Sequence, residues 1–395
     1  MPGRPASVCP RPRDLRRGAV LTLAFLAAVT AGATTGCWQR DGRDRAAPTA
    51  RTGLPAPRSP RETGTADREE VTRAAAEALA EGKSGKKAAQ EVVSRSGDRW
   101  GTVYDQGEYA AFTDALDGRW TGVGLWAAQR RDGRIEIDRV QPGAPAARAG
   151  LRPGDRLLSV DGQAVTGLRV PDVVALLRGE AGTPVVLNLS RDGADLTETL
   201  RRERLHTDPV TVRRLPGGIT VIKVASFTRG SGELVREAVR AAPPGAGVLL
   251  DLRGNPGGLV TEAVTAASAF LDGGLVATYD VRGDQHALYA DPGGDTARPL
   301  VALVDGGTMS AAELVTGALQ DRGRAVAVGS RTFGKGSVQM PTELPDGSVA
   351  ELTVGTYRTP AGRSLDGGGI TPDLAGGAAA EERAAAVLGG LGVGP

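Results

Sequence analysis

The chain has 395 residues, which is long enough for two or more domains and a sizeable core. Its formal net charge at pH 7 is +2, and no run of lysine and arginine is interleaved with aromatic residues. This balance argues against a nucleic-acid partner.

The start of the chain predicts export. A basic stretch, Arg11 to Arg17, precedes an apolar run of 16 residues, Gly18 to Ala33, which is too short and too small in side chain for a membrane-spanning helix. We therefore expect a signal peptide over residues 1–37.

A lipid anchor is expected at Cys37. The tetrapeptide Thr34-Thr35-Gly36-Cys37 resembles the bacterial lipobox, although Thr34 replaces the usual leucine. Cys9 would leave with the signal peptide, so Cys37 remains as an anchor or as a lone thiol. The alternative is an ordinary secreted protein. The expected location is therefore the outer face of the cytoplasmic membrane, or the medium.

Residues 38–66 are rich in Arg, Pro, Thr, Gly and Ala, which predicts a flexible tether. Residues 67–118 are expected to form an N-terminal helical segment, with helices over Arg68 to Ala80 and Gly85 to Ser94. Four aromatic residues follow, and we expect them to pack this segment onto the core: Trp100, Tyr104, Tyr109 and Phe112.

Residues 119–203 change to short strands and turns. Strands are expected over Ile135 to Val140 and Val185 to Leu189, and the run AGLRPGDRLLSVDG from Ala149 to Gly162 resembles a PDZ domain. The resemblance implies a β-sandwich that binds a peptide's C-terminal carboxylate while the peptide adds a strand to the sheet edge. The implied binding loop is Gly122, Val123, Gly124 and Leu125. The alternative is a PDZ-like sandwich that only gates an active site.

Strands and helices alternate again over residues 204–375. We expect strands over Ile219 to Phe227 and Gly247 to Leu252, and helices over Gly232 to Ala242 and Leu259 to Phe270. The intervening loop DLRGNPGG matches neither nucleotide-binding glycine motif, so nucleotide binding is rejected. The Gly/Ala-rich tail, residues 376–395, is expected to be a short helix or disordered.

Ser310 lies where a strand is expected to turn into a helix. The apolar run Leu300 to Val304 predicts a buried strand, and Ala311 to Gln320 predicts a helix. After a further expected strand, Ala325 to Gly329, the flexible corner Gly334-Lys335-Gly336 can bring an amine back over the helix start.

Lysine is rare in this chain. The lysines are Lys83, Lys86, Lys87, Lys223 and Lys335. Arginine carries most of the other positive charge and cannot act as a base, whereas a lysine in an apolar pocket can lose its proton near neutral pH. Lys335, with Phe333 nearby to exclude water, is therefore a candidate base for Ser310.

Two observations bear on this hypothesis. Ser310-Ala-Ala-Glu313 is also an S-x-x-E capping box, and this purely structural interpretation remains open beside the catalytic one. The histidines argue against a Ser-His-Asp triad, because His206 is expected in a polar linker and His286 in a loop over Asp280 to Asp295, with both side chains solvated.

The segments TMSAAE, from Thr308 to Glu313, and TFGKGSVQ, from Thr332 to Gln339, resemble the active-site signature of the C-terminal processing peptidases of family S41, also called tail-specific serine proteases. The serine-to-lysine spacing of 25 and the lysine-to-glutamine spacing of 4 both fit that family. Met309 stands where the family usually has a small residue. The similarity runs from about Val71 to Leu374.

The resemblance implies roles for individual residues. Ser310 would be the nucleophile, Lys335 the general base, Gln339 the group that orients the lysine, and Glu313 a support for the helix start. The oxyanion hole would be formed by backbone N–H groups, one from Gly257 or Gly258 and one from Ser310 or Ala311.

The implied architecture is a multidomain α/β protein with a crotonase/ClpP-like αβ spiral core at 204–375, an inserted PDZ β-sandwich at 119–203 and an N-terminal helical segment. The implied function is a serine endopeptidase that acts on exported or envelope proteins with free C-termini, without a metal or another cofactor. The membrane would be a partner through the lipid anchor, and a homodimer is left open. The alternatives are a non-catalytic PDZ scaffold and acyl-CoA chemistry on a crotonase-like core.

Overall fold

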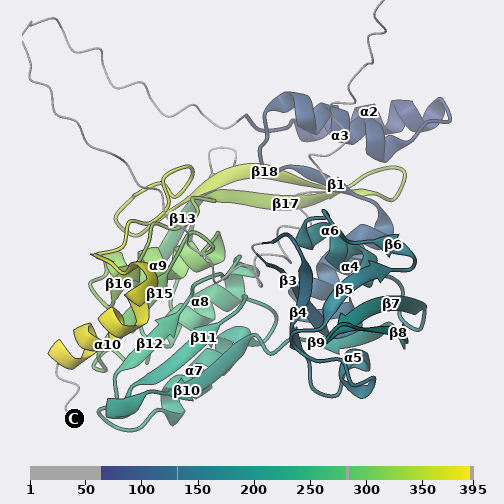
Figure 1. The fold of residues 1–395 in the computed structure, drawn as a ribbon. Helices are drawn as coiled ribbons and strands as arrows, with labels where there is room; N and C mark the ends of the chain where they lie inside the picture. Colours follow the sequence, from purple (N-terminus) through teal and green to yellow (C-terminus); the bar gives the residue numbers. More distant parts are fainter. Residues whose placement is uncertain (1–63, 131, 282–283, 392–395) are drawn as a thin grey trace, which may run out of the picture. The chain divides into compact units, whose positions relative to one another are not determined.

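A computed structural model describes residues 64–130, 132–281 and 284–391 (Figure 1). The expected signal peptide, Cys37 and nearly all of the expected tether lie outside the described residues. The described chain forms two compact units. Thr121–Glu203 is one, called here the inserted unit; the residues up to Trp120 and from Arg204 onward are the other, called here the core unit.

The inserted unit is built on an antiparallel sheet with the strand order β3-β4-β5-β7-β8, in which β6 also pairs with β5. Alternate residues of β4 and β7 are fully buried, as the two-residue period of a strand requires: Ile135, Ile137, Leu187 and Leu189. Strand β3 lies at the edge of the sheet and can accept a further strand there. The elements are β3 (Leu125–Gln129), β4 (Ile135–Val140), α5 (Pro145–Arg148), β5 (Arg156–Val160), β6 (Gln163–Ala164), α6 (Val170–Leu177), β7 (Pro184–Arg191) and β8 (Ala194–Arg201). Where the chain enters and leaves this unit, β2 (Arg119–Gly122) pairs with β9 (Glu203–His206).

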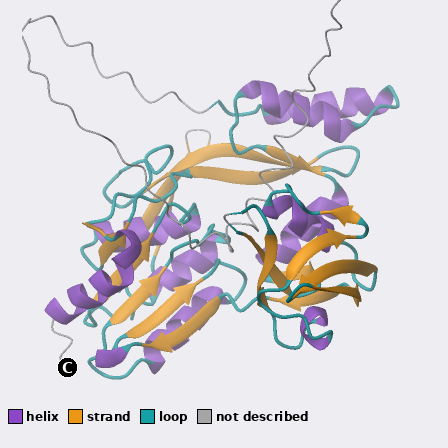
Figure 2. Cartoon of the chain, viewed as in Figure 1, coloured by secondary structure: helices purple, strands orange, loops and turns teal. Residues whose placement is uncertain are grey.

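The core unit contains a six-stranded sheet with the order β10-β11-β12-β15-β16-β19. Figure 2 draws the strands in orange and the helices in purple. All neighbouring pairs are parallel except β10 and β11. The strands are β10 (Val210–Arg214), β11 (Thr220–Val224), β12 (Val248–Asp251), β15 (Leu300–Val304), β16 (Val326–Gly329) and β19 (Leu374–Ala375). The helices that pack on it are α7 (Ser231–Ala241), α8 (Val260–Ser268), α9 (Ala311–Asp321) and α10 (Ala380–Gly390), with short 3-10 turns at Pro216–Gly218 and Gly377–Ala379.

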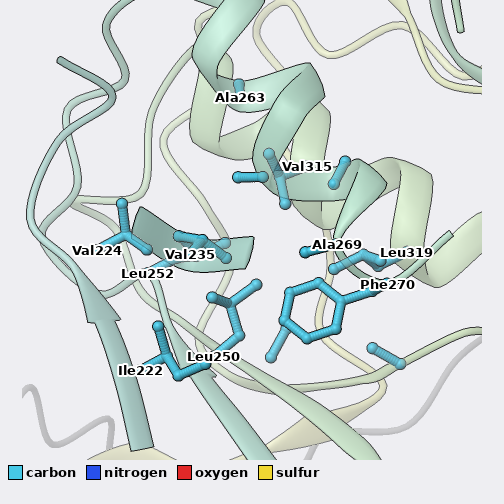
Figure 3. Packing of buried hydrophobic residues seen from close by; sticks show 14 of the residues in the cluster. Ile222, Val224, Val235, Leu250, Leu252, Ala263, Ala269, Phe270, Val315 and Leu319 are labelled. Carbon is cyan, nitrogen blue, oxygen red and sulfur yellow. The ribbon is translucent and has the colours of Figure 1, made fainter. Parts of the chain in front are cut away.

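The two faces of this sheet are covered by different helices. On one face, Ile222 and Leu250 belong to a cluster that also contains Val235 of α7 and Val315 of α9 (Figure 3). Phe270, which follows α8, belongs to the same cluster. On the opposite face, their strand neighbours pack against α10, in a cluster that includes Leu249, Val301, Leu303, Ala384 and Leu388. Because both faces are covered, the strands read in the sequence as nearly continuous apolar runs.

A second sheet of the core unit joins distant parts of the chain. Strand β18 (Val349–Arg358) pairs with β1 (Thr102–Tyr104), β13 (Leu275–Val281) and β17 (Ser337–Glu343), and β13 pairs with β14 (Asp284–Tyr289). The N-terminal helices are α2 (Arg68–Ala80), α3 (Gly85–Ser96) and α4 (Gln106–Leu116). Asp98 connects this N-terminal segment to β18, because its carboxylate accepts hydrogen bonds from the backbone N–H and the hydroxyl of Thr353.

The two histidines were expected in a linker and in a loop, and both of these expectations are wrong, because each histidine lies in a strand. The region expected to be a loop contains strand β14 and the end of β13, and His286 stacks on Tyr279 with ring centroids 5.0 Å apart. His206 ends strand β9 rather than lying in a linker. Both residues are exposed, as expected.

The tail forms helix α10. Within the described part of the chain, no helix has the length and apolar character needed to cross a membrane.

Candidate active site

Ser310 begins helix α9 in a strained backbone conformation. Its φ of 51° and ψ of −118° differ from the extended conformation of an ordinary N-cap residue. Positive φ is costly for a residue with a side chain and is found disproportionately at functional sites. The strain comes from the turn after β15, which carries the chain from a buried strand into the helix.

Glu313 connects this serine to the corner that carries Lys335. The Glu313 side chain is fully buried, and its Oε2 accepts hydrogen bonds from the backbone N–H groups of Ser310 and Lys335, both at 2.9 Å. The backbone nitrogens of Ser310 and Lys335 are therefore at most twice 2.9 Å apart. Its Oε1 accepts from the Thr332 hydroxyl at 2.6 Å and the Gly334 N–H at 2.8 Å.

The glutamate half of the expected capping box is thus present, and it also fixes the lysine corner. Burial raises the pKa of Glu313, while the four donors act in the opposite direction.

The Lys335 amine lies over an aromatic ring from the N-terminal segment. Its Nζ is 5.1 Å from the centroid of the Trp100 ring, and Phe333 packs on the same ring with centroids 5.8 Å apart. Burial lowers the pKa of Lys335 to about 8, against the opposing influence of the Glu351 and Asp98 carboxylates. A substantial neutral fraction near pH 8 is the property that a general base needs.

Gln339 contacts Trp100 in this structure. Its Nε2 donates a hydrogen bond to the backbone carbonyl of Trp100, whose ring lies under the Lys335 amine. Among the described residues no hydrogen bond joins Gln339 to Lys335, so the expected role of Gln339 in orienting the lysine stays a prediction.

The glycine loop after β12 lies directly against Ser310. A Cβ placed on Gly257 would be 3.0 Å from the Ser310 Cβ and 3.1 Å from the Ala311 nitrogen, so only glycine fits there. The Gly257 N–H donates to Asn255 Oδ1 at 2.8 Å and is therefore occupied. Among the described residues, no acceptor is found for the N–H groups of Gly258 and Ala311.

In the inserted unit, the expected carboxylate loop immediately precedes edge strand β3. The carbonyls of Val123 and Gly124 accept hydrogen bonds from the backbone of Ala146 and Gln141. Gly124 has a φ of 79°, which favours glycine at this position. With its carbonyls bonded inside its own unit, the loop can direct N–H groups toward a ligand.

Sequence reasoning did not identify Trp100 or Glu351 as neighbours of the lysine. Trp100 was expected only to pack its segment onto the core. The other three aromatic residues of the segment, Tyr104, Tyr109 and Phe112, contact one another. No local motif marks either residue, because both reach Lys335 through strand pairing around β18. In the described residues, no cluster of three His, Cys, Asp or Glu side chains is arranged to hold a metal ion.

Comparison with known proteins finds matches to two families. Residues 218–375 match Peptidase family S41, and residues 136–191 match the PDZ domain. The chain is 33% identical over 288 residues to the carboxy-terminal processing protease CtpA of Bacillus subtilis (strain 168), covering 72% of this chain and 62% of that protein. It is also 33% identical over 300 residues to a probable CtpA-like serine protease of Staphylococcus aureus (strain N315), covering 74% of this chain and 60% of that protein.

The chain thus spans about three fifths of the length of these curated relatives. Among solved structures, it is similar to a photosystem II D1 C-terminal processing protease, with 32% identity and a TM-score of 0.51. That match covers 74% of this chain and 81% of the other.

Proposed function

The chain belongs to the C-terminal processing peptidases of family S41, and on that premise we propose that it is a serine endopeptidase with a Ser310–Lys335 dyad. The observation that carries the proposal is the Glu313 carboxylate, whose Oε2 accepts from the backbone N–H groups of both residues. One buried anchor therefore holds a serine on a helix start next to a lysine whose pKa is lowered. This combination is what activation of a serine by an amine requires.

In the proposed reaction, the neutral Lys335 amine takes the Ser310 hydroxyl proton as Oγ attacks the scissile carbonyl carbon. The Gly258 and Ala311 N–H groups bind the resulting oxyanion. When the C–N bond breaks, the Lys335 ammonium gives its proton to the leaving amine, and an acyl-enzyme remains. Water then attacks the ester with the same proton transfers, which releases the second fragment and restores the serine.

The inserted unit is proposed to recognise substrate C-termini. The support for this part is the match to the PDZ domain together with a free edge at β3 preceded by the loop from Gly122 to Leu125. We also propose that the domains have the boundaries expected from the sequence and that the protease core has the crotonase/ClpP-like spiral fold. The enzyme is proposed to be exported, to be anchored through Cys37 or secreted, and to act on envelope proteins. We leave a homodimer open.

The test uses the purified full chain and an unstructured protein substrate with a free C-terminus. We expect Ser310→Ala and Lys335→Ala each to abolish cleavage, and a serine-reactive phosphonate to label Ser310 in the wild type. Ser330→Ala and Lys87→Ala, which change an exposed serine and an exposed lysine, are the matched controls and should cleave normally.

Cleavage that persists in either dyad variant would refute the dyad. Binding of C-terminal peptides by a wild-type protein that neither cleaves nor reacts with the phosphonate would instead indicate a non-catalytic scaffold.

A further inference from the structure

Three groups surround the Trp100 ring, and a fourth holds the backbone of this residue. The Lys335 amine lies 5.1 Å from its centroid, the Phe333 ring 5.8 Å away, and the Arg99 guanidinium carbon 5.0 Å away. Gln339 holds the Trp100 backbone carbonyl from strand β17. Phe333 is 47% exposed, whereas Trp100 and Lys335 are half-buried.

The Trp100 loop is itself fixed to the core unit. Asp98 accepts hydrogen bonds from the backbone N–H groups of Trp100 at 3.1 Å and Gly101 at 2.8 Å. The same carboxylate accepts from Thr353 on β18. A tryptophan held on both sides by hydrogen bonds to its backbone has little freedom to leave the amine, so its position is part of the folded structure.

We propose that Trp100 is a positioning residue for the reaction, which keeps the Lys335 amine dry and holds it above the ring in place for Ser310. The meaning of this inference rests on the proposed function, but its test does not, because the amine can be observed without turnover.

Two opposing effects decide the sign of the expected change. Contact with the ring face favours the charged ammonium, and in a desolvated site this interaction is worth about 2 kcal/mol, or about 1.5 pKa units. Exclusion of water favours the neutral amine by up to about 3–5 units in a fully buried site. Desolvation therefore prevails, and removing the ring should raise the pKa of Lys335.

The charged residues around the lysine remain in such a variant. Glu351 on β18 and Asp98 before β1 act on its amine. Glu313 on α9 accepts from its backbone N–H, Arg99 packs on the ring itself, and the backbone of Asp366 packs against Gly336. Because these residues are unchanged, a change in the Lys335 pKa can be assigned to the loss of the Trp100 ring.

The experiment is an NMR titration of the full chain carrying 13C-labelled lysine. Only five lysines contribute signals, and Lys335→Ala identifies the one of interest. We expect Trp100→Ala to raise the Lys335 pKa from about 8 by about one unit or more toward its ordinary value. Trp100→Phe should leave it close to that of the wild type, because the ring remains and the indole N–H has no hydrogen-bond partner among the described residues.

Two controls separate this role from a merely structural one. Phe112→Ala removes a half-buried ring of the same segment that stacks on Tyr104, and should leave the Lys335 titration unchanged. Lys86 is a second reporter, because its ion pairs with Asp105 and Glu108 join α3 to α4 and loosen if the N-terminal segment loses its folded structure. An unchanged Lys335 pKa in Trp100→Ala would overturn the proposal. So would an equal shift in Phe112→Ala, or a Lys86 signal that moves together with that of Lys335.

Discussion

Glu313 is the residue on which the geometry of the site depends most. Four donors converge on its two oxygens, from Ser310, Thr332, Gly334 and Lys335. A carboxylate with no exposed surface is expensive to bury, and here the convergent donors offset that cost. The side chain therefore determines where both members of the proposed dyad lie.

Substitution of Glu313 should affect stability and activity together. We expect Glu313→Ala to lower the free energy of unfolding by about 2–5 kcal/mol, because it leaves buried donors without acceptors. Glu313→Gln should also abolish cleavage, since its amide nitrogen replaces one acceptor oxygen. Urea denaturation and peptide cleavage provide the measurements.

The control for Glu313 is Glu262→Ala. Glu262 also accepts from two backbone N–H groups, those of Gly230 and Gly232, but away from Ser310. Near-normal cleavage by Glu313→Gln would show that the shared anchor is not needed.

The lysine also sets the pH dependence of the reaction. Because the proposed mechanism uses the neutral amine and burial lowers its pKa to about 8, kcat/KM should be low in mild acid and rise through about pH 8. Lys335→Arg should be inactive throughout, because a guanidinium stays protonated. The check is a profile of kcat/KM against pH, and a flat profile between about pH 6 and 9 would count against lysine as the base.

At the scale of elements, helix α10 stabilises the sheet face opposite α7, α8 and α9. Leu388 of α10 is fully buried against that face, whereas Leu391, which follows the helix, is 49% exposed. We expect Leu388→Ala to lower the free energy of unfolding by about 2–5 kcal/mol and Leu391→Ala to change it by less than about 0.5 kcal/mol. Chemical denaturation of both variants measures the difference, and equal effects would mean that α10 does not contribute this packing.

Elements with a strong apolar pattern were predictable. Strands β4 and β15 and helix α2 have the bounds expected from the sequence. Strand β14 was missed because its residues are nearly all exposed, so pairing with β13 stabilises it without an apolar pattern. The proximity of Ser310 to Lys335 could be anticipated from local motifs, but that of Trp100 to Gln339 could not, since 239 residues separate them.

At the scale of the whole molecule, the inserted unit has a hydrophobic core of its own, separate from the clusters of the core unit. If this unit captures chain ends, a free carboxylate should matter even when the cleaved bond lies upstream. We expect C-terminal amidation of a substrate to reduce kcat/KM about ten- to hundredfold, which is the loss of one or two hydrogen bonds to a charged group.

The measurement compares free and amidated forms of one peptide. A matched loss of binding to the separately expressed inserted unit would assign the effect to that unit. Equal cleavage of the two forms would mean that the carboxylate is not read.

The hydrogen bonds between Asp98 and Thr353 also bear on how the protein is made. A ribosome synthesises Ser310, Lys335 and Gln339 before Thr353, so the attachment of the Trp100 loop to β18 through Asp98 is completed only after that later threonine has emerged. On the proposed mechanism, a product truncated before β18 lacks this fastening, and we expect it to be unable to act as a stray protease.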